Sequence, residues 1–181
     1  MSGDRDAETD IATRESWKTL PIPEARAELR FSQTYDLADF ERIKRGLIPE
    51  AMEDKWFIFF EEPWLYLHRS WTGACIYGVR FQPGEGGFTA VESWVSRDPQ
   101  QYKEDSIDYD RAVLGFLIDR MLLGRPVPFP VRSDLPAGTP EGVYQHHIVG
   151  RAYPEREFRV AQPKRSVWSW LKGLWGTRST P

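Results

Sequence analysis

The chain has 181 residues, a formal net charge of −3 at pH 7 and a single cysteine. The negative balance gives no general attraction for nucleic acid, so we expect no binding to duplex DNA or RNA. One cysteine excludes an internal disulfide and any metal cluster held by several cysteines. Hydrophobic residues make up 40% and charged residues 28% of the sequence, which is typical of a soluble globular protein.

Residues 1–16 are polar and mostly acidic, which predicts a disordered tail. They lack the organisation of a secretion signal, and no apolar run approaches the roughly 18 residues that span a bilayer. We therefore expect a cytoplasmic protein with one folded domain over residues 17–160 and a separate basic segment over residues 161–181. Within the domain, residues 24–30 are compatible with a short helix.

Two principal helices are predicted on either side of a group of strands. Asp36 is well suited to cap the first, and apolar residues follow at helical spacing: Leu37, Phe40, Ile43 and Leu47. The second begins near Ser106 or Asp108 and runs to Gly124. Its apolar band is wide, which predicts that it lies across the sheet as the main core helix.

Four strands are predicted between these helices, over residues 55–61, 64–70, 74–82 and 88–97. Short connections between them favour an antiparallel meander, and residues 142–153 can add a fifth strand. The layout predicts an α+β fold. In this fold, a mainly antiparallel meander of four to five strands packs against the two principal helices, with a separate amphipathic helix at the C-terminus.

Side chains alternate between the two faces of a strand, so the pattern predicts the composition of each face. The face toward the second helix is expected to hold Phe57, Phe59, Leu65, Leu67, Ile76, Val91 and Val95, interrupted by Arg69 and Arg80. The other is expected to hold Trp56, Ile58, Phe60, Trp64, Tyr66, His68, Tyr77, Val79, Phe81 and Trp94, with one acid, Glu92. A one-residue bulge would exchange parts of these sets.

The second face is rich in aromatic rings, which leaves three interpretations open. The first helix, residues 127–160 or the C-terminal helix can cover it. A partner protein can bind it, or a nucleobase or other small ligand can stack on it. The candidate ligand-binding residues are His68, Arg69, Arg80, Trp71, Tyr66, Tyr77 and Trp94.

Two arginines on a sheet favour either packing at its margin or a site for a phosphate or carboxylate, which guanidinium groups bind bidentately. His68, Ser70 and Glu92 are weak catalytic candidates, because no clear triad pattern surrounds them. The chain has three histidines, and its glycine-rich turn lacks the Lys-Ser/Thr of a phosphate loop. We therefore expect no metal site and no cofactor.

The C-terminal segment 164–175 is basic, and its apolar residues fall on one side of a helix: Val167, Trp168, Trp170, Leu171, Leu174 and Trp175. Such a helix suits a groove on a partner, a membrane interface or its own domain. The combined expectation is a non-enzymatic interaction protein, such as an accessory or immunity-type protein in a bacterial system. It would bind a partner protein through the aromatic face and this helix. The alternatives are a small enzyme or sensor for a nucleotide-like or phosphorylated ligand near His68, Arg69 and Arg80, and peripheral membrane association through the helix.

Overall fold

The computed structural model describes residues 11–51 and 53–130. The predicted strand near residues 142–153 and the predicted C-terminal helix over 164–175 lie outside the described residues. Within them, residues 11–16 belong to the folded domain, which corrects the prediction of a disordered tail up to residue 16. Ala12 is buried, and Arg14–Ser16 form a single 3₁₀ turn, η1.

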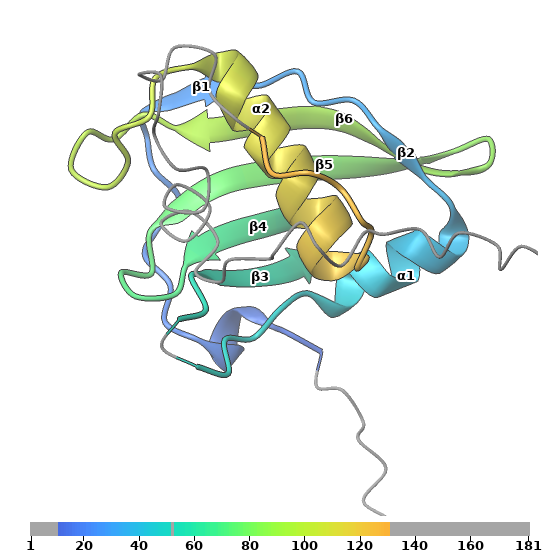
Figure 1. The fold of residues 1–181 in the computed structure, drawn as a ribbon, viewed down its shortest axis with the longest axis horizontal. Coiled ribbons are helices and arrows are strands. Elements are labelled where there is room, and N and C mark those ends of the chain that lie inside the picture. Colours follow the sequence, from blue (N-terminus) through green and yellow to red (C-terminus); the bar gives the residue numbers. More distant parts are fainter. Residues whose placement is uncertain (1–10, 52, 131–181) are drawn as a thin grey trace, which may run out of the picture.

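Six antiparallel strands form one sheet, which confirms the predicted α+β architecture (Figure 1). The order across the sheet is β1-β6-β5-β4-β3, and β2 pairs with another part of β6. The strands are β1 (Arg26–Glu28), β2 (Thr34–Tyr35), β3 (Trp56–Glu61), β4 (Trp64–Arg69), β5 (Cys75–Gly84) and β6 (Gly87–Ser96). Strands β3 to β6 are the predicted meander, and β1 and β2 extend the sheet beyond it.

Strand β1 forms within residues 24–30, where the sequence is also compatible with a short helix. Arg26 to Glu28 pair with the C-terminal end of β6, from Trp94 to Ser96. That edge of β6 would otherwise leave its backbone groups without partners, and pairing satisfies them. The long-range pairing therefore outweighs the local helical tendency of this segment.

Helix α1 (Leu37–Arg45) begins as predicted, because the Asp36 carboxylate accepts a hydrogen bond of 2.8 Å from the Asp39 backbone N–H. It buries Phe40 and Ile43 against the core. The helix ends at Gly46, whose φ of 70° lies in the left-handed region, so Leu47, the last residue of the predicted apolar stripe, lies beyond it.

Helix α2 (Ile107–Phe116) continues into a π-helical segment, η2 (Leu117–Leu122), and together they cross one face of the sheet (Figure 1). The Ser106 hydroxyl caps α2 by accepting a hydrogen bond from the Tyr109 backbone N–H. The core between α2 and the sheet is built from fully buried side chains such as Ile58, Leu65, Leu67 and Leu114. Each of these contributes about 1.5–3 kcal/mol by leaving water.

The predicted composition of the two faces is wrong for β3, because the β3–β4 pairing is offset by one residue from the expected register. Phe57 lies opposite His68, and Phe59 lies opposite Tyr66, so all four share the face away from α2. The α2 face instead receives Trp56, Ile58 and Phe60, together with Leu65 and Leu67.

A register shift corrects the assignment of β5 as well. It lies between Leu67 and His68 on β4 and skips Ile76 of β5. As a result, Tyr77, Val79 and Phe81 join the core under α2. A second shift, between Arg80 and Phe81, skips Val91 of β6, and Val91 is 44% exposed instead of packing under α2 as predicted. Arg80 moves to the opposite face, where it pairs with Glu92. Other positions follow the prediction: Ile76, Val95 and Arg69 on the α2 face, and Trp64, Tyr66, His68 and Trp94 on the other.

Candidate functional site

The aromatic face away from α2 is covered by the chain's own residues 11–20. Ala12 packs into a cluster with Phe57, Phe59, Tyr66, Cys75 and Trp94. The Arg14 guanidinium lies 5.2 Å from the ring centre of Phe59 and 5.6 Å from that of Tyr66, and it forms an ion pair with Glu61. This cover comes from the N-terminal segment and not from the first helix, whereas residues 131–160 and the C-terminal helix lie outside the described residues. The rings of this face are therefore core, not an open platform.

The N-terminal segment is fastened to the loop between β4 and β5. The indole N–H of Trp17 donates a hydrogen bond of 2.8 Å to the Ser70 carbonyl, and the Leu20 backbone N–H donates one of 2.8 Å to the Gly73 carbonyl. Both bonds hold the segment beside the loop that carries Trp71 and Thr72. Residues 17–20 therefore fix this loop from one side.

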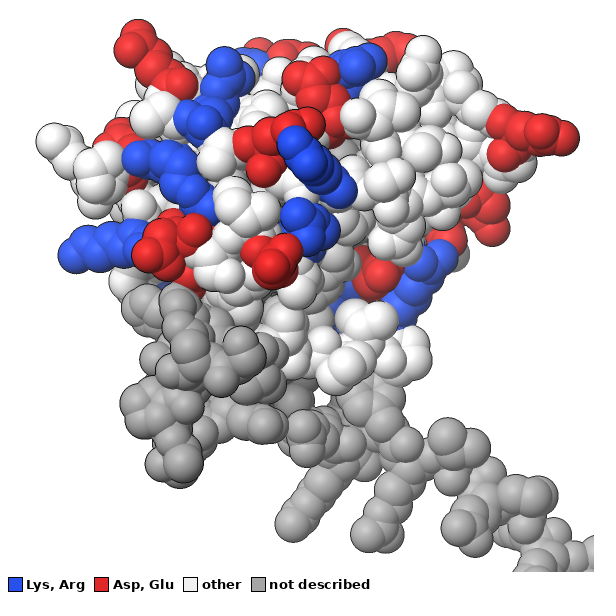
Figure 2. All heavy atoms as spheres, turned by 90° about the horizontal axis from the view of Figure 1, so that it is seen from above, with Lys and Arg blue, Asp and Glu red and all other residues white. Residues whose placement is uncertain are grey.

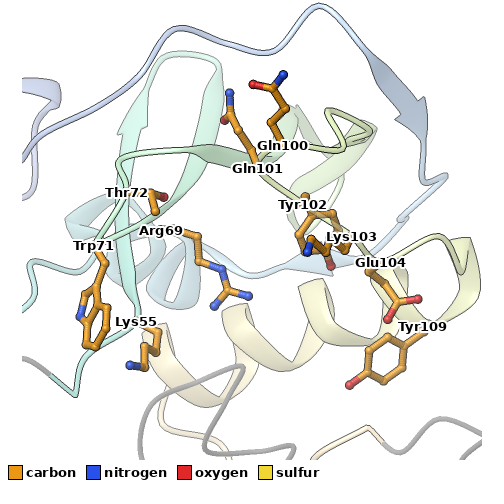
Figure 3. Close-up of a pocket in the computed structure, with 10 residues that line it drawn as sticks. All are labelled: Lys55, Arg69, Trp71, Thr72, Gln100, Gln101, Tyr102, Lys103, Glu104 and Tyr109. Atoms are coloured by element: carbon orange, nitrogen blue, oxygen red, sulfur yellow. The ribbon is translucent and has the colours of Figure 1, made fainter.

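A cavity of about 690 Å³ opens on the α2 side of this loop (Figure 3). Its walls come from the residue before β3, the end of β4, the β4–β5 loop, the segment between β6 and α2, and the first turn of α2. The lining residues are Lys55, Arg69, Trp71, Thr72, Gln100, Gln101, Tyr102, Lys103, Glu104 and Tyr109. This volume is in the range of small-molecule sites in proteins.

Two of the cations in this cavity lie on aromatic rings. The Lys55 ammonium lies 3.7 Å from the ring centre of Trp71, and the Arg69 guanidinium lies 4.3 Å from that of Trp56. Trp56 is fully buried and stacks on Tyr77, so the surface beneath Arg69 is rigid. Burial lowers the pKa of Arg69, with partial compensation from Tyr77 and Tyr102, but an arginine remains charged at neutral pH.

The charges that line the cavity are mostly positive. Among the described lining residues, Lys55, Arg69 and Lys103 are basic and Glu104 is acidic. The Glu104 carboxylate accepts hydrogen bonds from the backbone N–H groups of Asp105 and Ser106, which fastens it to the start of α2. On the molecular face seen in Figure 2, by contrast, acidic and basic side chains are interspersed. A local attraction for anions therefore arises from the cavity itself.

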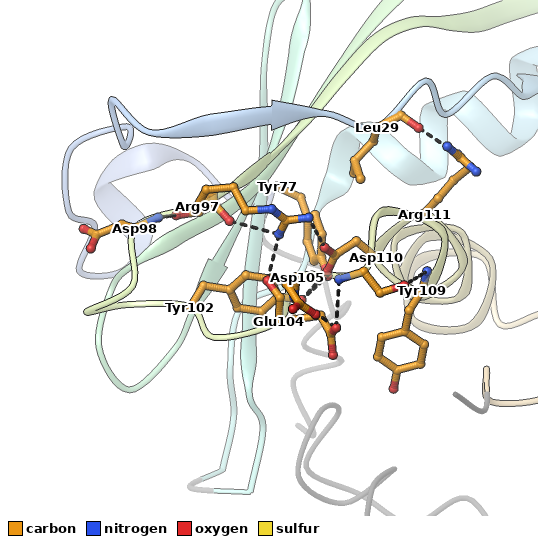
Figure 4. Close-up of polar contacts among 12 residues, drawn as sticks. Leu29, Tyr77, Arg97, Asp98, Tyr102, Glu104, Asp105, Tyr109, Asp110 and Arg111 are labelled. Carbon is orange, nitrogen blue, oxygen red and sulfur yellow. Dashed lines mark hydrogen bonds and ion pairs between the residues drawn. The ribbon is translucent and has the colours of Figure 1, made fainter. Parts of the chain in front are cut away.

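Beside the cavity lies a buried polar network centred on Asp110 of α2 (Figure 4). The hydroxyls of Tyr77 and Tyr102 both donate hydrogen bonds to Asp110 Oδ1, and Arg97 donates one of 2.7 Å to Oδ2. The two hydroxyls are also 2.8 Å apart. Tyr102 is the member of this network that also lines the cavity, so the network fixes one cavity wall.

Loss of hydration governs the titration of this network. Burial raises the pKa of Asp110, opposed by the hydrogen bonds from Tyr102 and Arg97. Burial likewise raises the pKa values of Tyr77 and Tyr102, so both phenols are neutral near pH 7. The network therefore presents neutral hydroxyls around a carboxylate that is paired with an arginine.

The candidate residues from the sequence divide between this cavity and other places. Arg69 and Trp71 line it, and Tyr77 belongs to the adjoining network. Tyr66, His68 and Trp94 lie on the opposite face of the sheet. Their side chains are accordingly separated from Arg69 by the sheet.

Arg80 and Glu92 also lie outside the cavity, on the opposite face of the sheet, where they form a salt bridge of 2.9 Å with each other. Sequence reasoning missed Lys55, Tyr102, Lys103 and Tyr109. The last three lie around the predicted cap of the second helix. The signal that the sequence offered for these residues was the aromatic-basic pair Tyr102-Lys103, just before the predicted start of the second helix.

The weak catalytic candidates His68 and Ser70 are both engaged by backbone carbonyls. His68 is 1% exposed, and its Nδ1 donates a hydrogen bond of 2.8 Å to the Gly73 carbonyl. Its Nε2 has no hydrogen-bond partner among the described residues, and burial lowers the pKa of the imidazole. The Ser70 hydroxyl donates to the Asp54 carbonyl. The geometry of this pair is that of structural residues fixing the loop.

Comparison with family models, with curated proteins and with solved structures finds no match to this chain. Over residues 11–51 and 53–130, no helix has the length and apolar character needed to cross a membrane. The functional argument therefore depends on the geometry of the cavity.

Proposed function

We propose that the protein binds a small anionic molecule, bearing a phosphate or carboxylate, in the cavity lined by Arg69. The observation that carries this proposal is the placement of Lys55 and Arg69 on aromatic rings at 3.7 and 4.3 Å, within one cavity of about 690 Å³. Cations that are already oriented lose little side-chain entropy when an anion binds.

The surroundings of Arg69 favour the binding of an oxyanion. A guanidinium presents a planar set of donors that matches a phosphate or carboxylate in bidentate geometry. The rings of Trp56 and Tyr77 lower the local dielectric, which strengthens the attraction between Arg69 and an anion. Lys55, whose ammonium lies on the ring of Trp71, supplies a second positive charge to the same cavity.

The chemistry of the lining residues supports binding rather than catalysis. Tyr102 is neutral near pH 7 and is already bonded to Asp110. The Glu104 carboxylate is bonded to two backbone N–H groups. A general base needs a free acceptor near the reacting proton, and these groups are occupied. A binding or sensing role is therefore the proposal.

Isothermal titration calorimetry with inorganic pyrophosphate and with ribose 5-phosphate tests this proposal. Arg69→Met keeps an unbranched stem on Trp56 and removes the charge. We expect it to weaken binding about tenfold or more, because a hydrogen bond to a charged group contributes about 1.5–3 kcal/mol. Affinity should also fall as salt is raised.

Arg80→Met is the matched control, because Arg80 lies on the same sheet, pairs with Glu92 and is outside the cavity. It should leave the affinity unchanged. Equal effects of the two substitutions, or an absence of binding by both probes, would contradict the proposal.

Binding of a partner protein or of a membrane depends on the segment 164–175 and stays a prediction. That segment lies outside the described residues, and the aromatic sheet face that was expected to assist it is covered by residues 11–20. The specific support from the described residues therefore favours the anionic ligand.

A further inference from the structure

Trp71 forms a shared wall between the cationic cavity and a second hollow. The second hollow has a volume of about 500 Å³ and lies between the N-terminal segment, the chain after α1 and the β4–β5 loop. Its lining residues are Trp17, Lys18, Pro49, Glu50, Ala51, Ser70 and Trp71. Trp71 is the residue that both sets have in common.

The loop that carries Trp71 is held in one conformation. The Gly73 backbone N–H donates a hydrogen bond of 2.8 Å to the Arg69 carbonyl, and the Ser70 backbone N–H donates one of 3.0 Å to the Lys55 carbonyl. Gly73 has a φ of 79°, and a Cβ there would lie 3.2 Å from the Lys18 carbonyl oxygen. The backbone that carries Trp71 is therefore fixed, and the Lys55 ammonium packs on its indole at 3.7 Å.

The second hollow presents two indoles that keep much of their surface in water. Trp71 is 56% exposed and Trp17 is 37% exposed. Trp17 is fixed by its bond to the Ser70 carbonyl, so the two rings border the hollow in a defined arrangement. Preformed aromatic surface of this kind favours the stacking of a planar ring, since every such ring has an apolar face to cover.

The charges of the two compartments differ. Among the described lining residues, the hollow has one base, Lys18, and one acid, Glu50, whose formal charges cancel. The described lining of the cavity on the other side has three bases and one acid. An anion is therefore attracted to the cavity and an uncharged ring to the hollow.

We propose that the ligand of this protein combines an anionic group with a planar ring, as nucleoside monophosphates do. The anion is held by Arg69 and Lys55, and the ring stacks on Trp71 in the hollow bordered by Trp17 and Pro49. This inference depends on the proposed function, because it places the anion in the same cavity. It adds the ring compartment and makes Trp71 the residue that determines specificity.

Calorimetry with three probes separates the two contributions. AMP carries both the ring and the anion, ribose 5-phosphate carries only the anion, and adenosine carries only the ring and sugar. We expect AMP to bind about tenfold or more tightly than ribose 5-phosphate, in line with the stacking of a base on an aromatic side chain. Adenosine should bind more weakly than AMP and should be insensitive to Arg69→Met.

Trp71→Ala should weaken the binding of AMP by a larger factor than that of ribose 5-phosphate, because it removes the stacked ring for AMP and, for both probes, the indole that supports Lys55. Trp71→Phe retains a ring and should restore most of the affinity. Circular dichroism confirms that both variants fold. The ring proposal is overturned if ribose 5-phosphate binds as tightly as AMP, or if Trp71→Ala weakens both probes equally, and anion binding then stands alone. If neither phosphate binds, both proposals fail.

Discussion

Asp110 and Arg97 form an ion pair at 2.7 Å in which the carboxylate is fully enclosed and the guanidinium side chain remains 21% exposed. The two residues join the first turn of α2 to the end of β6 and also fix Tyr102, a wall of the cavity. Stability and the proposed binding site are thus connected through one carboxylate.

Removal of this carboxylate is expected to destabilise the fold. Asp110→Ala leaves Arg97 and two tyrosine hydroxyls without their common acceptor, which should lower the free energy of unfolding by about 3–5 kcal/mol. Urea unfolding followed by circular dichroism measures the change. Asp108→Ala is the control, because its carboxylate is 92% exposed and pairs with Arg111 within the helix. A loss below about 1 kcal/mol for Asp110→Ala would contradict the assignment.

The buried imidazole of His68 predicts a loss of stability in mild acid. Its folded pKa is lowered from the ordinary value of 6.5, with burial as the largest cause, so the unfolded chain takes up the proton more readily. The stability contributed by neutral His68 is complete above the unfolded pKa and is lost as the pH falls through the lower folded pKa.

His68→Asn keeps a side-chain N–H for the Gly73 carbonyl but does not titrate. Urea unfolding between about pH 5 and 8 should show a flatter pH dependence for the variant than for the wild type. Both proteins contain the same carboxylates, so the difference between their stability curves reports the contribution of His68. The raised pKa of Asp110 changes the stability in the opposite direction as the pH falls, and it does so in both proteins. Parallel curves for the two proteins would refute the prediction.

Gly78 on β5 is expected to tolerate no side chain. A Cβ at this position would lie 2.3 Å from the indole of Trp94, which packs over it from β6. Gly78→Ala should therefore lower the free energy of unfolding by about 1–3 kcal/mol through overpacking. Gly84→Ala on the same strand is the control, because its Cβ would meet its nearest atom at 3.9 Å. Thermal unfolding compares the two, and a neutral Gly78→Ala would show that Trp94 lies elsewhere.

The Cys75 thiol is expected to be unreactive in the folded protein. It is completely buried, and burial raises its pKa to about 12, so the thiolate is scarce at neutral pH. A chromogenic disulfide reagent should label the denatured chain rapidly and the native chain only as fast as it opens. Immediate labelling of native protein would place the thiol at the surface.

Deletion of residues 164–181 tests the prediction for the C-terminal helix. If this helix contacts a partner protein, the truncated chain should keep its circular dichroism and its phosphate affinity but lose the partner on co-purification. Liposome flotation that requires Trp168 and Trp175 would instead assign the helix to a membrane surface. A truncated chain that retains every interaction would reject both.

The sequence predicted the secondary structure better than it predicted the faces. The alternation along β3 and β4 was visible, but which residues share a face depends on a one-residue choice in the turn. The pairing of Phe57 with His68 settles that choice, the bulge at Ile76 then reassigns β5, and the bulge at Val91 alters β6. Nothing in the local pattern of apolar residues marks such bulges.

The cavity was predicted only in part, for a related reason. Arg69 and Trp71 lie close together in the chain and were singled out, whereas Tyr102 and Lys103 approach them from the segment before α2. Their proximity follows from the tertiary packing of α2 on the sheet, which periodicity does not encode. The cover over the aromatic face was missed because residues 11–16 are polar overall, and the contacts come from one small apolar residue, Ala12, and one cation, Arg14.

The attachment of the N-terminal segment has a consequence for how the chain is made. The hydrogen-bond acceptor of Trp17 is the carbonyl of Ser70, 53 residues later in the chain, and that of Leu20 is the carbonyl of Gly73. During synthesis, this segment leaves the ribosome well before the strands on which it rests. Residues 11–20 therefore reach their native position only after β4 and the β4–β5 loop have emerged from the ribosome. Until then, Trp17 of the nascent chain is exposed to solvent and to other molecules.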